Sequence, residues 1–199
     1  MRGGAGDNRD RMNAHDNAAA TAPRDLAAAL QRAAAALRRR PQLGVHDDAP
    51  ATARWEGNTR VVASHANGTQ VATDMPGELG GTGDRVTPGW LFRAGVASCA
   101  TTSIAMTAAA EGIALTALEV RVSSRSDTRG LLGMTDADGA PVYAGPGDVR
   151  MHVRIFAPDA TPERLRALVE KAYRCSPIPN AVVNAVSVGL DVEVAGTGD

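Results

Sequence analysis

The chain has 199 residues, of which 44% are hydrophobic and 22% charged, a balance typical of a globular protein with one sizeable core. Its formal net charge is -1 and its charges are interspersed, so the sequence offers no basic stripe for binding nucleic acid or anionic lipid. No apolar run reaches the roughly 20 residues of a membrane-spanning helix, and the first residues lack the apolar core of a signal peptide. We therefore expect a cytoplasmic protein.

The first fifty residues divide into two predicted parts. Residues 1–22 are rich in Gly, Asp, Asn, Arg and Ala without a period, which predicts a disordered tail. Pro23 then opens a run of strong helix formers that closes with three arginines before Pro41, and this run predicts an appended helix over residues 23–40. The helix carries no residues with evident chemistry, so we expect a structural or dimer-packing role.

Residues 50–195 are expected to form the main domain, beginning with strands. Three short strands are predicted first, at residues 51–56, 60–65 and 69–73, with Asn67-Gly68 as a hairpin turn. Alternating apolar residues predict three more strands later in the chain, within residues 118–122, 149–155 and 188–194. Together with the helices described next, these strands indicate an α+β domain with antiparallel sheet packed on helices.

Two main helices are predicted within this domain. Thr87 and Pro88 supply an N-cap and a first helical residue, and Gly112 marks the far end of a long helix. The interior of this helix has Arg93 as its only charge and is apolar or small on every side, which is typical of a helix buried in the middle of a fold. A second, amphipathic helix starts at Thr161-Pro162 and ends near Cys175, and a short helix over residues 177–184 is expected to follow it.

The chain has two cysteines, and their placement raises the question of redox chemistry. Cys99 lies inside the long helix, and Cys175 lies at the end of the amphipathic helix, where it can face the long one. A cysteine in an Ala-rich buried helix is by composition a small hydrophobic residue. Two cysteines on facing helices also fit a redox pair, because a sulfenic acid on one needs a thiol beside it to be captured. The residue pattern leaves both interpretations open.

Three motifs carry a resemblance to a known family. The sequence reads ELGGTG at residues 78–83, TPGWLFRAGVASC at residues 87–99 and CSPIPN at residues 175–180. Over about residues 50–195 the chain resembles the OsmC/Ohr family, the osmotically inducible and organic hydroperoxide resistance proteins. The resemblance implies an OsmC-like α+β fold, with antiparallel sheets around a long buried central helix. It also implies an intertwined homodimer with two active sites at the subunit interface.

The resemblance also implies roles for individual residues. The first cysteine of such proteins attacks an organic hydroperoxide, and the second resolves the sulfenic acid to a disulfide, roles that fall to Cys99 and Cys175. A dithiol reductant, such as a lipoyl protein, then restores the thiols, and no bound cofactor or metal is expected. Activating the thiolate needs positive charge, for which Arg60 is the candidate. Independently of the resemblance, Trp90 and Phe92 lie at the start of the long helix, where they are either core residues or, as the candidate substrate-binding residues, line the mouth of a pocket.

The sequence departs from the family pattern at one position. Gly89 stands ten residues before Cys99, where these peroxidases usually carry a Glu that holds the activating Arg. Glu78 could replace that carboxylate only if its loop folds back over the site, and Arg54 is the second candidate for the cation. The alternative function is therefore an OsmC-like protein that binds an apolar ligand or senses oxidants without efficient turnover. A metal enzyme is the weakest interpretation, because the four histidines show no ligand spacing.

Overall fold

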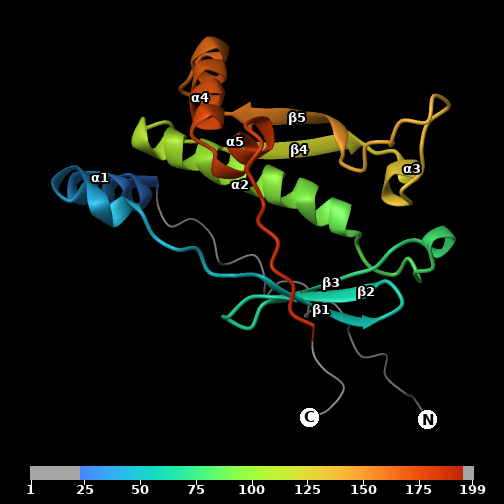
Figure 1. Ribbon diagram of the computed structural model, residues 1–199. Coiled ribbons are helices and arrows are strands. Elements are labelled where there is room, and N and C mark those ends of the chain that lie inside the picture. Colours follow the sequence, from blue (N-terminus) through green and yellow to red (C-terminus); the bar gives the residue numbers. More distant parts are fainter. Residues whose placement is uncertain (1–22, 195–199) are drawn as a thin grey trace, which may run out of the picture.

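The computed structural model describes residues 23–194, and their side chains from Leu26 onward. The predicted tail at residues 1–22 lies outside the described residues. The chain is a mixed α+β structure with two antiparallel sheets (Figure 1). In chain order the helices and strands are α1 (Pro23–Arg39), η1 (Pro41–Gly44), β1 (Thr52–Gly57), β2 (Arg60–Ser64), β3 (Gln70–Thr73), η2 (Gly77–Leu79), α2 (Pro88–Ala110), β4 (Ala117–Arg125), α3 (Thr128–Leu131), β5 (Gly147–Phe156), α4 (Pro162–Arg174) and α5 (Pro177–Val183).

The first sheet has the order β1-β2-β3 and follows the predicted meander. Val62 on the central strand pairs with Arg54 on one side and Ala72 on the other. The Asn67-Gly68 turn lies where it was predicted, and the Gly68 amide donates to the carbonyl of His65 at 3.0 Å. The strand β1 is exposed almost throughout, and Trp55 keeps 70% of its surface accessible. No described element therefore covers this sheet closely.

The second sheet is the antiparallel pair β4-β5, which packs on α2. In both strands every second residue is half-buried, with Val120 and Val153 directly opposite each other. The core beneath this sheet is made by Ile104, Ala108, Leu168 and Ala172, all at most 2% exposed. Alternation at period two therefore places one apolar face of the hairpin on the helices, as predicted.

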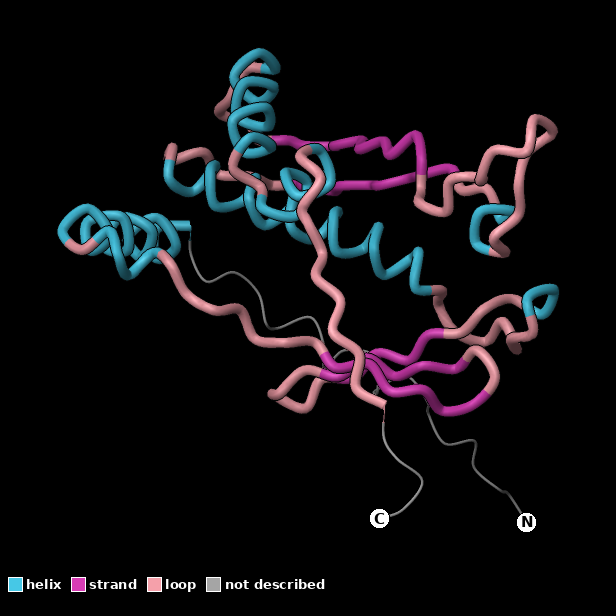
Figure 2. Tube along the Cα trace, in the orientation of Figure 1, coloured by secondary structure: helices cyan, strands magenta, loops and turns pink. Residues whose placement is uncertain are grey.

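The long helix α2 begins as predicted, because the Thr87 hydroxyl accepts the Trp90 amide at 3.2 Å and Pro88 needs no partner for its nitrogen. Its burial differs from the prediction. Only the face toward β4-β5 and α4 is buried, while Met106 on another face is 39% exposed. Figure 2 shows α2 passing between the two sheets in this view. An apolar helix is buried only where another element covers it. Here β4-β5, α4 and α5 bury one side of α2, and α1 contacts another side without burying Met106.

The predicted strand at residues 188–194 is absent, and this prediction is wrong for the described chain. Residues 186–194 form no regular secondary structure, and Val188 and Leu190 are 92% and 85% exposed. Alternating apolar residues make one face of a strand, but the strand forms only when a neighbour accepts its backbone hydrogen bonds. No strand among the described residues pairs with this segment.

The helices α4 and α5 lie where they were predicted. The inner face of α4 buries Leu168 at 1% exposure, and α5 follows directly after Ser176. Glu111, at the end of α2, joins α2 to α4 through ion pairs with Arg164 at 2.7 Å and Lys171 at 2.8 Å. The hydrogen bond from Lys171 is the main cause that lowers the pKa of Glu111. Between residues 23 and 194, no helix is long and apolar enough to cross a membrane.

Candidate active site

The half-buried Cys99 is held by the segment between α4 and α5. Its sulfur lies 3.3 Å from Oγ of Ser176 and accepts the backbone N–H of Ile178 at 3.4 Å. Ser176 is fully buried. The structure therefore brings Cys99 to the residues that immediately follow Cys175.

Cys175 lies at the C-cap of α4 and is exposed. Both cysteines are free thiols in this structure. The turn that contains Cys175 is held by Asn180, whose side-chain amide donates to the carbonyls of Ser176 at 2.8 Å and Arg174 at 3.1 Å. The turn that contains Cys175 is thus held in place, and the residues after it lie next to the Cys99 sulfur. The assigned redox roles of the two cysteines stay predictions.

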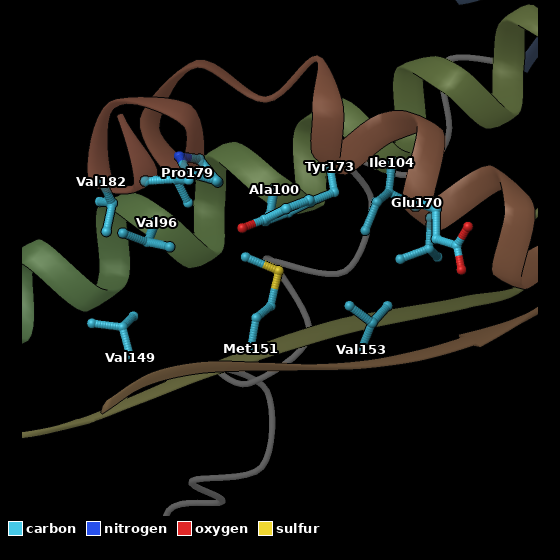
Figure 3. Close-up of a pocket in the computed structure, with 12 residues that line it drawn as sticks. Val96, Ala100, Ile104, Val149, Met151, Val153, Glu170, Tyr173, Pro179 and Val182 are labelled. Atoms are coloured by element: carbon cyan, nitrogen blue, oxygen red, sulfur yellow. The ribbon is translucent and has the colours of Figure 1, made fainter. Parts of the chain in front are cut away.

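An apolar cavity of about 400 Å³ lies between β5 and the helices α2, α4 and α5. Figure 3 shows Met151 rising from β5 toward the helices and Tyr173 extending from α4 across the cavity beside Ala100. Glu170 supplies the charge in an otherwise apolar lining, and it lies at one end of the cavity in this view. Such a cavity suits an alkyl or aryl group better than a polar one.

The cavity and the Cys99 sulfur both adjoin one contact between α2 and the start of α5. Ala100, directly after Cys99, lines the cavity, and so does Pro179, directly after Ile178. Cys99 itself does not line it. Trp90, at 47% exposure, and Phe92 also lie outside the lining of this cavity, and their predicted role at a pocket mouth stays a prediction.

Arg60 lies in a separate polar cluster on the first sheet. Its guanidinium pairs with Asp74 at 3.1 Å and also with Asp84, and it donates to the Thr82 hydroxyl at 2.9 Å. Among the described residues, no hydrogen bond joins Arg60 to Cys99. Two carboxylates already compensate this cation, and its role at Cys99 stays a prediction.

Asp74 is the centre of that cluster and was missed by the sequence analysis. Its side chain is 2% exposed and accepts the hydroxyls of Thr59 at 2.6 Å and Thr82 at 2.7 Å. These hydrogen bonds, with Thr59 first, hold the pKa of Asp74 well below its usual range. A Cβ added at Gly81 would overlap the Met75 carbonyl, so the loop can close around Asp74 only with glycine there. The cluster therefore fixes the loop that leads into α2.

Comparison with known families settles the relationship of the chain. The family model described as OsmC-like protein matches residues 81–191, more than half of the chain, and the match includes Cys99 and Cys175. The chain belongs to the OsmC-like protein family. The predicted resemblance is thereby confirmed, and the structural relatives of this OsmC-like chain include organic hydroperoxide resistance proteins.

Solved structures show the same fold. An OsmC-like protein from Mycoplasma pneumoniae is 18% identical, with a TM-score of 0.59 over 71% of this chain and 91% of that one. An organic hydroperoxide resistance protein from Elizabethkingia anophelis is 24% identical, with a TM-score of 0.54 and the same coverage of 71% and 91%. An OsmC-like protein of unknown function from Vibrio cholerae is 12% identical, with a TM-score of 0.56 over 68% and 94%. The search of curated proteins gave no match.

In this OsmC-like chain Gly89, at the position where the family pattern predicts a Glu, lies next to Arg93 and not next to Arg60. A Cβ built at Gly89 would lie 3.7 Å from Nη1 of Arg93, which itself donates to the Ser124 hydroxyl of β4 at 3.3 Å. Glu78 is exposed in η2, and within residues 26–194 its side chain makes no hydrogen bond or ion pair. Arg54 is exposed on β1. Neither Glu78 nor Arg54 is brought to Cys99 by a contact in the described chain.

Proposed function

We propose that the protein is a thiol-dependent peroxidase that reduces organic hydroperoxides to alcohols. The observation that carries this proposal is the position of Cys99. Its sulfur contacts the segment directly after Cys175 and receives a backbone N–H, next to an apolar cavity of about 400 Å³. A nucleophilic thiol, a second thiol in the adjoining turn and an apolar cavity are the parts that such a reaction needs.

The proposed reaction has three steps. The Cys99 thiolate attacks the terminal oxygen of the hydroperoxide R–O–O–H, and the O–O bond breaks. The sulfur becomes a sulfenic acid, and the alkoxide takes a proton from solvent to give the alcohol. The Cys175 thiol then condenses with the sulfenic acid to give a disulfide and water. An external dithiol, such as a lipoyl protein, reduces this disulfide by exchange and is itself oxidised.

The surroundings of Arg60 support a second candidate function. This guanidinium is engaged by Asp74 and Asp84, and Gly89 provides no carboxylate to hold a cation near Cys99. A protein with this arrangement would bind an apolar ligand in the cavity, or sense oxidants through Cys99, without efficient turnover. The two candidates differ in whether hydroperoxide is consumed catalytically.

We further propose a cytoplasmic homodimer, as the family resemblance implies. Three open surfaces support a second copy as partner: the sheet β1-β2-β3, the exposed stripe of α2, and the apolar residues of the segment 186–194. Such surfaces are costly to leave in water. In that assembly Arg60 remains the proposed activating cation, and Trp90 and Phe92 remain the proposed substrate-binding residues.

Consumption of cumene hydroperoxide in the presence of a dithiol tests the proposed function. We expect the native chain to consume many equivalents and Cys99→Ser to consume none, because the attacking sulfur is lost. Cys175→Ser should turn over more slowly than the native chain, because only the external dithiol is left to attack the sulfenic acid. Ser98→Ala, which changes an exposed residue beside Cys99, is the matched control and should behave as the native chain. No turnover by the native chain with several dithiols would leave the binding or sensing function.

A further inference from the structure

Ser176 occupies the N-cap position of α5, but its hydroxyl does not cap that helix. The side chain makes no hydrogen bond to the first turn of α5. Its Oγ instead lies 3.3 Å from Sγ of Cys99, and the residue is 0% exposed. A hydroxyl enclosed in this way must find its partner within the protein. The hydrogen-bond partner of the Ser176 side chain in the structure is the Cys99 sulfur.

A second donor reaches the same sulfur. Pro177 and Pro179 have no backbone N–H, so Ile178 lies between two residues that cannot donate. The Ile178 amide donates to Cys99 Sγ at 3.4 Å. Asn180 holds this turn by donating to the Ser176 carbonyl at 2.8 Å. The sulfur therefore faces one hydroxyl and one amide, and the amide lies between two prolines that restrict the backbone.

We propose that the Ser176 hydroxyl is a catalytic group that stabilises the ionised sulfur of Cys99, with the Ile178 amide as the second donor. The inference deepens the proposed peroxidase function and rests on it for its catalytic meaning. It gives Cys99 neutral donors within its own chain, where the family pattern uses an arginine. A hydrogen bond to an ionised group is roughly twice as strong as one between neutral groups, so the pair favours the thiolate.

The direction of the contact becomes fixed when Cys99 ionises. In the neutral state either the Cys99 S–H or the Ser176 hydroxyl can be the donor at this distance. In the ionised state the hydroxyl hydrogen of Ser176 rotates toward the sulfur and donates to it. Neither state leaves a buried polar group without a partner. The proton of Cys99 leaves for solvent, and no other group has to move.

Alkylation of Cys99 by iodoacetamide tests this role without any need for turnover. The parent is Cys175→Ser, and the rate is measured at several pH values from slightly acidic to neutral. Ser176→Ala should lower the thiolate fraction roughly tenfold, because one hydrogen bond to the charged sulfur is lost. A less stabilised thiolate is also more nucleophilic, which leaves a net fall in rate of about threefold. Ser176→Thr keeps the hydroxyl and should restore most of the rate.

Two controls separate this effect from general damage. Ser98→Ala should alkylate at the parent rate, and thermal unfolding should show that Ser176→Ala is folded, since its hydroxyl makes no bond to α5. A folded Ser176→Ala that alkylates as fast as the parent overturns the proposal. So does a Ser176→Thr that is as slow as Ser176→Ala.

Hydrogen exchange at the Ile178 amide gives a test that does not depend on Ser176 variants. Cys99→Ala removes the acceptor and should speed exchange at Ile178, whereas Cys99→Ser keeps an acceptor and should slow it again. Equal exchange in both variants would contradict the contact. Neither alkylation nor hydrogen exchange uses hydroperoxide. A native chain that fails to turn over hydroperoxide would therefore refute the peroxidase proposal, and the alkylation and exchange rates would still decide the role of Ser176.

Discussion

Around Cys99 the chain presents neutral hydrogen-bond donors, whereas the guanidinium groups of Arg60 and Arg93 have partners elsewhere. Arg60 is paired with Asp74 and Asp84, and Arg93 donates to Ser124. A Cβ added at Gly89 would lie 3.7 Å from the guanidinium of Arg93, which is an ordinary contact distance. A carboxylate at this position would therefore recruit Arg93 within the first turns of α2.

We predict that Gly89→Glu stabilises the protein more than Gly89→Ala does. Alanine in place of glycine near the start of α2 should add about 0.5 kcal/mol, because the unfolded chain loses freedom. Glutamate should add about 0.5 kcal/mol more, through the positive end of α2 and the pair with Arg93. Urea unfolding measures both differences. Equal stability of the two variants, at low and at high salt, would contradict the pairing with Arg93.

At the scale of elements, the loop between β3 and α2 is fixed by the buried Asp74. Gly81 lies against the Met75 carbonyl, which an added Cβ would overlap, whereas a Cβ at Gly77 would meet no atom within 4 Å. A side chain at Gly81 would therefore force the loop to move, whereas a side chain at Gly77 would fit without a clash.

We predict that Gly81→Ala destabilises the fold by about 3 kcal/mol, because the loop must open to admit the methyl group. Gly77→Ala is the matched control, and it should be neutral or stabilising by about 0.5 kcal/mol. Chemical denaturation gives both values. A loss below about 1 kcal/mol for Gly81→Ala would mean that the loop does not need its close approach to Asp74.

Local signals in the sequence account for most of the elements and for little of the site. The start of α2 at Thr87 follows from capping chemistry, and the burial of β4 and β5 follows from alternation at period two. The contact of Ser176 with Cys99 joins residues 77 positions apart, and the one between Arg60 and Asp74 joins β2 to the loop that follows β3. No periodicity encodes such pairings, because they depend on how the elements pack.

The strand predicted at residues 188–194 is absent for the same physical reason. The sequence of this segment does alternate between apolar and other residues, but its apolar side chains are exposed to solvent. Its formation depends on a neighbouring backbone, which is a property of the whole assembly rather than of the segment.

At the scale of the whole molecule, the open surfaces predict a dimer. We expect light scattering coupled to size exclusion to give twice the mass of the chain. Leu190→Asp places a charge among the apolar side chains of the segment 186–194 and should raise the dimer dissociation constant at least about a hundredfold. Ser187→Asp changes the alternate face of that segment and should have little effect. A native chain that is monomeric at all concentrations would contradict the dimer.

The central claim, that Cys99 reduces organic hydroperoxides with Cys175 as its resolving thiol, is tested most directly by mass spectrometry after a single equivalent of cumene hydroperoxide. In Cys175→Ser we expect Cys99 to gain one oxygen atom as a sulfenic acid. In the native chain we expect the loss of two hydrogens, with Cys99 and Cys175 joined in one peptide pair. Unmodified Cys99 in both proteins, with the hydroperoxide intact, would contradict the account.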